Sequence, residues 1–265
     1  MSQGSPQHDS YPWYDSIWLS QFTHARHIVS TVAPSKLAAF DGAFDVLHTR
    51  QDFEVQRLDS VFGDDTFDEI LRVAASLSLN ELEAHETQSF GRFVVHDHPF
   101  FTQLQQQLVP LVSEAAGEPV EPNYNFLSRY GSTGICQVHM DAPEAKWTLD
   151  VCLRQSEPWP IHFSQIQPWP HSEADGYPDA WEDRIKDSPD AEFTSYALEP
   201  GQAVLFSGSS QWHYRDEMPQ GGSKAPFCDL LFFHFIPAGT AALLKPANWA
   251  QMFGIPELEQ VASNG

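Results

Sequence analysis

Apolar residues recur every three or four positions in two stretches of the first part of the chain, which is the spacing of amphipathic helices. The second stretch, 99–116, begins at Pro99 and ends before Gly117, as expected of helix termini, and Pro110 inside it is expected to kink the helix. The first stretch, 66–77, places these residues on one face: Phe67, Ile70, Leu71, Ala74 and Leu77. We therefore expect two helices before the middle of the chain.

From residue 123 onwards the pattern changes to short apolar or alternating runs of strand length. Gly and Pro separate these runs, which is typical of a β-sandwich or a β-barrel. The sequence thus predicts an α+β fold with a mainly β core and helices packed outside it. The predicted strands are 124–130, 147–153, 161–164, 193–198, 203–206 and 227–236.

The chain of 265 residues shows no internal repeat or low-complexity tract, so we interpret it as a single domain, 1–265. Residues 1–120 are expected to be mainly helical support, 121–240 the β core, and 241–265 a C-terminal tail. The stretch 166–192 is polar, acidic and too long for a hairpin turn. Loops of that length are often lids or binding loops, so we predict an insertion or lid there.

The amino-acid composition limits the kinds of molecule that this protein is expected to bind. The 36 acidic residues against 14 basic ones give a net charge of −22, and the bases are spread along the chain. Nucleic acids and anionic membranes are therefore unlikely partners, and a small molecule is the expected one. The sequence has no membrane-spanning run and no secretory signal, and its three cysteines lack metal or disulfide spacing. These features predict a cytoplasmic protein; they do not indicate its oligomeric state.

Candidate metal ligands begin with the tripeptide His139-Met140-Asp141. Residues two apart in a strand point to the same side, so both side chains can face one pocket. Imidazole nitrogen and carboxylate oxygen, completed by a second histidine, are the ligands of non-haem Fe(II) oxygenases. On the tripeptide alone, an ordinary pair of surface or core polar residues is the favoured interpretation.

A second histidine follows at a suitable place. The tight turn Pro200-Gly201 leads into the apolar run 203–206, and His213 comes seven residues later. This order places His213 at the mouth of a strand. Trp212 and Tyr214 flank it and could shield a metal from bulk water.

These segments together resemble the Fe(II)/2-oxoglutarate-dependent dioxygenase superfamily, specifically its prolyl-4-hydroxylase-like branch. The resemblance covers about residues 123–237. It implies a double-stranded β-helix (jelly roll, cupin-like) with N-terminal buttressing helices. It also implies Fe(II) as cofactor, 2-oxoglutarate as co-substrate, O₂ as oxidant, and His139, Asp141 and His213 as catalytic metal ligands. The matching segments are Asn125–Tyr130, Gly131, Gly134, His139, Asp141, Pro200–Phe206, His213 and Gly222-Ser223-Lys224.

The resemblance further implies a buried cation for the far carboxylate of 2-oxoglutarate. Lys224 lies near the family position, eleven residues after His213. Arg215 and then Arg129 are the alternatives, and an arginine would bind the carboxylate bidentately where a lysine supplies a point charge. Tyr130, at the end of the first matching segment, is the fourth candidate for cofactor binding.

The function expected from the resemblance is hydroxylation of a small molecule such as an amino acid or a natural-product intermediate. Asp141 favours hydroxylation, because related halogenases lack this carboxylate; desaturation or ring formation stay open. The alternatives are a peptidyl (prolyl-type) hydroxylase and a cupin-type metal-binding barrel of non-oxygenase function. Outside the triad, the cluster His96-Asp97-His98 is interpreted as a helix start, and His234 as a core histidine or a pocket residue.

Overall fold

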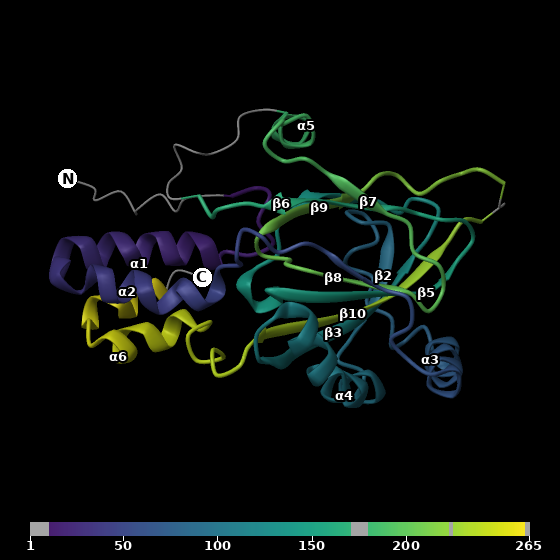
Figure 1. The fold of residues 1–265 in the computed structure, drawn as a ribbon, viewed down its shortest axis with the longest axis horizontal. Helices are drawn as coiled ribbons and strands as arrows, with labels where there is room; N and C mark the ends of the chain where they lie inside the picture. The colour runs from purple at the N-terminus through teal and green to yellow at the C-terminus, as the bar shows by residue number, and fades with distance from the viewer. Residues whose placement is uncertain (1–10, 171–179, 223–224, 263–265) are drawn as a thin grey trace.

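Two antiparallel sheets lie face to face in the computed structural model, which describes residues 11–170, 180–222 and 225–262 (Figure 1). In spatial order, the six-stranded sheet consists of β1 (Gln56–Leu58), β8 (Ala203–Phe206), β5 (Trp147–Gln155), β10 (Cys228–Pro237), β3 (Val120–Tyr130) and β2 (Arg92–His96). The four-stranded sheet consists of β4 (Cys136–His139), β9 (Gln211–Arg215), β6 (Ile161–Ile166) and β7 (Thr194–Tyr196). The predicted α+β class with a mainly β core is confirmed.

The two predicted helices cover the outer face of the six-stranded sheet (Figure 1). They are α3 (Asp64–Ser76) and α4 (Pro99–Ala116), and their apolar faces pack with buried sheet residues such as Leu127 and Leu231. Pro99 begins α4, and His98 caps it by accepting a hydrogen bond from the backbone N–H of Phe100 at 3.3 Å. Gly117 ends α4 in the left-handed conformation, with φ +75°, which glycine adopts without steric cost.

A group of helices forms one end of the molecule (Figure 1). Buried aromatic rings hold it together, among them Trp18, Phe44 and Trp249. Residues 241–262, part of the predicted tail, thus contribute short helices to this core. The helices are α1 (Trp18–Val32), α2 (Leu37–Phe44), α6 (Trp249–Phe253) and α7 (Glu259–Ala262), with 3₁₀ turns at Pro34–Lys36, Asp45–Leu47, Pro246–Asn248 and Pro256–Leu258.

The predicted insertion, 166–192, contains one short helix, α5 (Trp181–Lys186). Residues 171–179 of this insertion lie outside the described residues. The 3₁₀ turn Pro143–Ala145 lies between β4 and β5 in the sequence.

An N-terminal strap, defined here as residues 11–15, lies beside the end of β4. The backbone N–H of Met140 donates to the carbonyl of Trp13 at 3.0 Å, and the N–H of Asp15 donates to the carbonyl of Met140 at 3.2 Å. The Trp13 ring packs edge-on against Trp212, with centroids 4.7 Å apart. Both backbone polar groups of Met140, the residue between His139 and Asp141, are therefore bonded to the strap.

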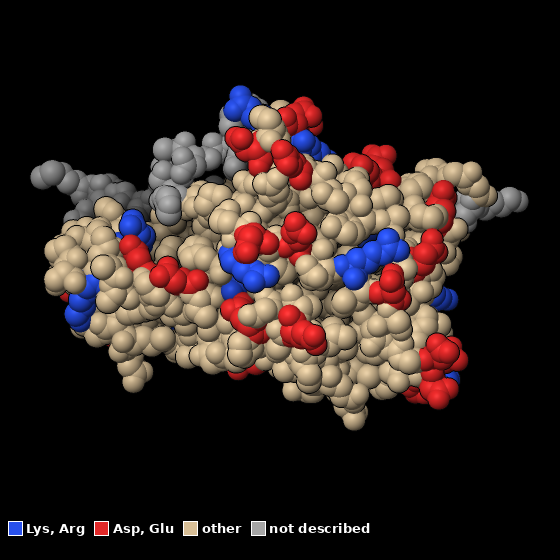
Figure 2. Space-filling view, viewed as in Figure 1, with Lys and Arg blue, Asp and Glu red and all other residues tan. Residues whose placement is uncertain are grey.

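Acidic side chains are scattered over the surface seen in Figure 2, and the basic ones there form no continuous patch. This distribution is not that of a surface that binds a polyanion. Among the described residues, no helix combines the length and the apolar character that crossing a membrane requires.

Candidate metal centre and its cavity

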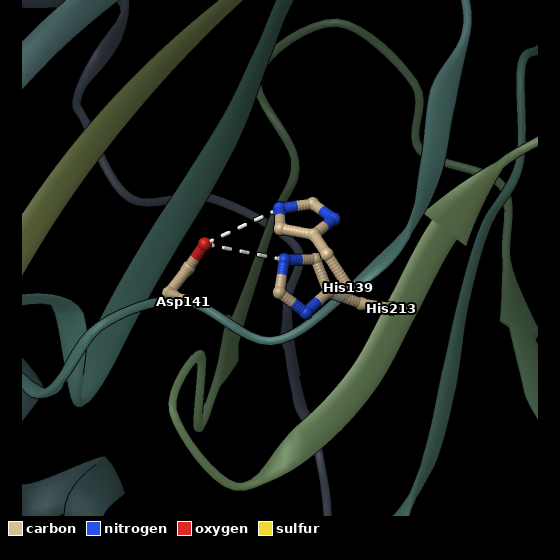
Figure 3. Close-up of side chains that lie close together, drawn as sticks. All are labelled: His139, Asp141 and His213. Atoms are coloured by element: carbon tan, nitrogen blue, oxygen red, sulfur yellow. Dashed lines mark ion pairs between the residues drawn. The ribbon is translucent and has the colours of Figure 1, made fainter. Parts of the chain in front are cut away.

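The three predicted ligands meet at the end of the four-stranded sheet (Figure 3). His139 is the last residue of β4 and lies directly opposite His213 of β9 in the strand register. Asp141 follows two residues later and turns its carboxylate toward both rings. One ligand atom from each residue falls in a group whose members are all within 4.8 Å of one another.

Hydrogen bonds fix which imidazole nitrogens face the carboxylate. The Nδ1 atom of His139 lies 2.8 Å from the carbonyl of Gln137, and that of His213 lies 3.0 Å from the carbonyl of Gln211. A carbonyl only accepts, so each Nδ1 carries the proton and donates it. When the ring is neutral, each Nε2 then keeps its lone pair for another partner, which is the form in which histidine binds a metal.

The geometry of the acceptor atoms fits a cation. The two Nε2 atoms lie 3.4 and 3.6 Å from Oδ1 of Asp141, for His139 and His213 respectively. When the rings are neutral, the Nε2 atoms and the carboxylate oxygen are all acceptors, so they make no hydrogen bond with one another. Two ligands each about 2.1 Å from a metal and at right angles are roughly 3 Å apart. The donor set and its spacing thus suit a divalent metal ion such as Fe(II).

The Asp141 carboxylate is held from its far side. Its backbone N–H donates to the carbonyl of Gly208 at 2.9 Å. A Cβ atom on Gly208 would lie 2.3 Å from Oδ2 of Asp141, so only glycine leaves room for the carboxylate. The hydroxyl of Thr148 lies 3.5 Å from the same oxygen. Gly208 and Thr148, which the sequence analysis did not single out, therefore position this ligand.

The charge state of Asp141 suits metal binding. Burial alone would raise the pKa of its carboxyl, but without a metal the positive charge of the protonated imidazoles of His213 and His139 outweighs burial and holds the pKa well below its usual range. The group is therefore an ionised acceptor at neutral pH.

The metal site lies in a cavity between the two sheets, in which the space open to the centre of a water molecule is about 130 Å³. One water needs roughly 10–15 Å³ by that measure, so the cavity has room for a small organic molecule. Its lining includes all three ligands and, on the opposite wall, a panel of aromatic rings: Tyr124, Phe126, Phe232 and His234.

Arg215 lies two residues beyond His213 on β9 and lines the same cavity. Its guanidinium is buried, donates to Oδ2 of Asp150 at 2.7 Å, and also donates to the carbonyl of Trp159. Burial lowers the pKa of Arg215, but the carboxylate of Asp150 outweighs this and raises it, so the side chain stays charged. Arg215 thus joins β9 to β5 of the other sheet.

A second buried arginine, Arg92 of β2, also lines the cavity. It pairs with Glu86, donates to the hydroxyl of Tyr130 at 2.7 Å, and lies over the rings of Phe90 and Phe126. Sequence reasoning missed Arg92 because the resemblance begins only at residue 123. The apolar, β-branched run Phe93-Val94-Val95 is the signal that could have revealed this strand.

The remaining candidates for binding 2-oxoglutarate lie in different places. Tyr130 is buried and lines the cavity. Arg129, its neighbour on β3, lines a separate surface hollow with Arg154 and donates to the carbonyl of Ala74. Lys224 lies outside the described residues. Of the predicted cations, Arg215 is therefore the one that the described part of the chain brings to the metal site.

His234 of β10 belongs to the cavity wall and not only to the core. Its Nδ1 atom lies 3.0 Å from the hydroxyl of Thr148, and its ring stacks on Tyr124 with centroids 4.2 Å apart. Burial lowers its pKa to about 4, so the ring is neutral at physiological pH. Its Nε2 atom has no hydrogen-bond partner. His234 thus presents one neutral, unused nitrogen to the cavity.

Comparison with solved structures shows the fold. SnoN, an α-ketoglutarate-dependent epimerase from nogalamycin biosynthesis solved with Fe³⁺, α-ketoglutarate and nogalamycin RO, is 15% identical, with a TM-score of 0.53; the match covers 80% of this chain and 90% of SnoN. The carbocyclase SnoK is 10% identical at a TM-score of 0.51, covering 75% and 88%. EctD from S. alaskensis is 16% identical at 0.50, covering 76% of each chain.

No protein-family model and no curated protein matches the sequence. At these identities the structural likeness establishes the fold alone. The predicted double-stranded β-helix is confirmed, since the chain shares the fold of SnoN, SnoK and EctD.

Proposed function

We propose that this protein is an Fe(II)/2-oxoglutarate-dependent oxygenase, an oxidoreductase that acts on a small molecule. The observation that carries the proposal is the convergence of two imidazole Nε2 atoms and one carboxylate oxygen inside a cavity of the double-stranded β-helix. SnoN and SnoK, which are α-ketoglutarate-dependent enzymes of the same fold, support the proposal. Fe(II), 2-oxoglutarate and O₂ are the expected cofactor and co-substrates.

In this proposal, different residues of the cavity bind the iron and the substrate. His139, Asp141 and His213 would hold the iron on one side, and a two-histidine, one-carboxylate set leaves the positions opposite open for co-substrates. Bound iron and 2-oxoglutarate would supply the oxidation chemistry, while the protein positions a substrate C–H bond and excludes water. The ring panel opposite the ligands is suited to holding the substrate body.

Arg215 is the proposed partner of the far carboxylate of 2-oxoglutarate. It lies on the same strand and side as His213, about 7 Å along the strand by the usual rise, a separation comparable to the length of the co-substrate. Asp150 and the Trp159 carbonyl use only part of its five N–H donors. Tyr130 and Arg92 lie close enough to line the same cavity. Lys224 and Arg129 remain the competing predictions.

The enclosed cavity favours a small molecule over a peptide, which would need an open groove. The intact Asp141 ligand favours hydroxylation among the reactions open to this class. Membership of the prolyl-4-hydroxylase-like branch and a cytoplasmic location remain predictions.

Anaerobic titration of the Fe(II)-loaded protein with 2-oxoglutarate tests the proposal. We expect the weak visible charge-transfer band of the chelated metal to appear with the native chain and to be lost in Asp141→Ala. Asp68→Asn, an exposed acid on α3, is the matched control and should keep the band. A protein that binds iron but shows no band would favour the cupin-type barrel of other function.

A second titration identifies the basic residue. We expect Arg215→Lys to raise the Kd for 2-oxoglutarate by at least about tenfold, because the bidentate contact is lost. Arg129→Lys should leave the Kd unchanged. An effect confined to Lys224→Ala would replace Arg215 with Lys224 as the carboxylate partner.

A further inference from the structure

The charged groups that line the cavity are paired, with one exception. Arg215 is matched by Asp150, Arg92 is matched by Glu86, and Asp141 faces the two metal-binding imidazoles. Asp15 of the strap also lines the cavity; it is exposed to solvent, and its carboxylate makes no ion pair or hydrogen bond with any described residue. The mouth of the cavity therefore carries one carboxylate without a direct partner among the described residues, close to the candidate metal centre.

The backbone fixes the position of Asp15. Its N–H donates to the carbonyl of Met140 at 3.2 Å, between the first two metal ligands in the sequence. Asp15 also lines an adjoining hollow of about 120 Å³, together with Phe90, His139 and Trp181. Asp15 thus lines both the inner cavity and this outer hollow, as do Phe90 and His139.

A second group indicates that a ligand belongs in this cavity. The Nε2 atom of His234 has no hydrogen-bond partner in the described part of the chain, although the residue is only 3% exposed. A buried polar atom without a partner is costly, and a hydrogen bond from a bound molecule removes that cost. His234 lines the cavity on the wall opposite the metal ligands.

The aromatic panel does not itself attract a cation. Tyr124 stacks on His234 at 4.2 Å, and Phe126 stacks on Phe232 at 4.8 Å between centroids. Neighbouring rings therefore cover one another's faces and leave mainly their edges to the cavity. Ring edges carry partial positive charge, so the panel suits an apolar or flat body, and a positive charge must be bound elsewhere.

Resting on the proposed function, we propose that the substrate carries a protonated amine, which the carboxylate of Asp15 binds where the cavity meets the hollow. The apolar body of the substrate then packs against the ring panel, and His234 makes a hydrogen bond to it. The net charge of −22 favours the approach of cations.

Three probes of similar size and shape test this proposal: 2-phenylethylammonium, 2-phenylethanol and 3-phenylpropanoate. Ligand-observed NMR titrations use protein loaded with Zn(II) and 2-oxoglutarate, at pH 7 and about 0.15 M ionic strength, where contacts beyond roughly 8 Å are screened. We expect the ammonium to bind at least about tenfold more tightly than the alcohol, as a charge-assisted contact does. The carboxylate should bind most weakly.

Variants assign the preference to one residue. Asp15→Asn should abolish the preference for the ammonium, Asp15→Glu should keep most of it, and Asp68→Asn should leave it unchanged at the same net charge as Asp15→Asn. Equal binding of ammonium and alcohol by the native chain, tighter binding of the carboxylate, or an unchanged preference in Asp15→Asn would overturn the proposal.

The same titrations without 2-oxoglutarate separate the two hypotheses. A protein that fails to bind 2-oxoglutarate yet prefers the ammonium through Asp15 refutes the proposed oxygenase function and leaves the cation site standing. A protein that binds 2-oxoglutarate but shows no preference for the ammonium refutes only the cation site.

Discussion

The two sheets of the barrel contribute differently to the cavity. The short four-stranded sheet supplies polar groups: His139 and His213 face each other across β4 and β9, and Arg215 follows on β9. The long strands of the six-stranded sheet supply the ring panel and the groups that support the ligands. The candidate metal ligands are thus placed by the pairing of two short strands, whereas the opposite wall, which a substrate would contact, is built by longer strands of the other sheet.

Removing a ligand from the short sheet should have the largest effect. We expect His213→Ala to lower the affinity for Fe(II) by more than about 100-fold, since even loss of an outer partner of a ligand costs about 10–100-fold. Metal analysis after dialysis measures this, with circular dichroism to confirm that the fold persists. Full metal retention would mean that His213 is not a ligand.

Gly208→Ala tests whether the long sheet and the loop after β8 hold Asp141 in place. The new Cβ would lie 2.3 Å from Oδ2 of Asp141, so the carboxylate must move away from the two imidazoles. We expect a loss of Fe(II) affinity of about 10–100-fold in the same assay, without unfolding. Gly63→Ala, where nothing lies within 4 Å of the added atom, is the control.

The ion pair between Arg215 and Asp150 is the polar link between the sheets. Arg215→Met leaves the fully buried carboxylate of Asp150 without its partner, and we expect the free energy of unfolding to fall by about 3–5 kcal/mol. Urea unfolding measures the change. The double variant Arg215→Met, Asp150→Leu should recover much of the loss; a double variant as unstable as the single one would point to packing as the cause.

We expect His234, a residue of β10 in the six-stranded sheet, to make the free energy of unfolding depend on pH in the acid range. Its pKa is about 4 in the folded chain against an ordinary value of 6.5, so the unfolded chain binds more protons between these values. The free energy of unfolding therefore falls as pH decreases from about 6.5 to about 4, by roughly 3 kcal/mol from this residue.

Comparing the native chain with His234→Phe isolates that contribution, because the other histidines titrate in both. In urea unfolding at a series of pH values, the free energy of unfolding should change less steeply with pH in the variant than in the native chain. Equal slopes would mean that His234 is not buried in its neutral form.

Thr148→Val should give the smallest effect. It removes the hydroxyl that lies between Oδ2 of Asp141 and Nδ1 of His234, while keeping the shape of the side chain. We expect Fe(II) affinity to fall by about tenfold. Thr148→Ser, which keeps the hydroxyl, should restore most of it; a deficit equal to that of the valine variant would trace the loss to packing.

The sequence by itself determined much of this protein. Helical periodicity gave 66–77 and 99–116 close to their observed bounds, because an amphipathic face is a local pattern. The run 203–206 was predicted with the bounds of β8, since Gly and Pro mark its ends. The grouping of His139, Asp141 and His213 was also predictable: His139 and Asp141 are two residues apart, and the turn before β8 precedes His213; their role as metal ligands stays a prediction.

Only the tertiary structure decided what surrounds these ligands. Asp15 reaches the cavity because a backbone bridge ties the strap to Met140, and Arg92 reaches it because β2 pairs with β3. Gly208 matters through a steric contact with Asp141, a residue far from it in the chain. Such contacts depend on strand register and close packing between distant segments, and no local pattern of residues encodes them.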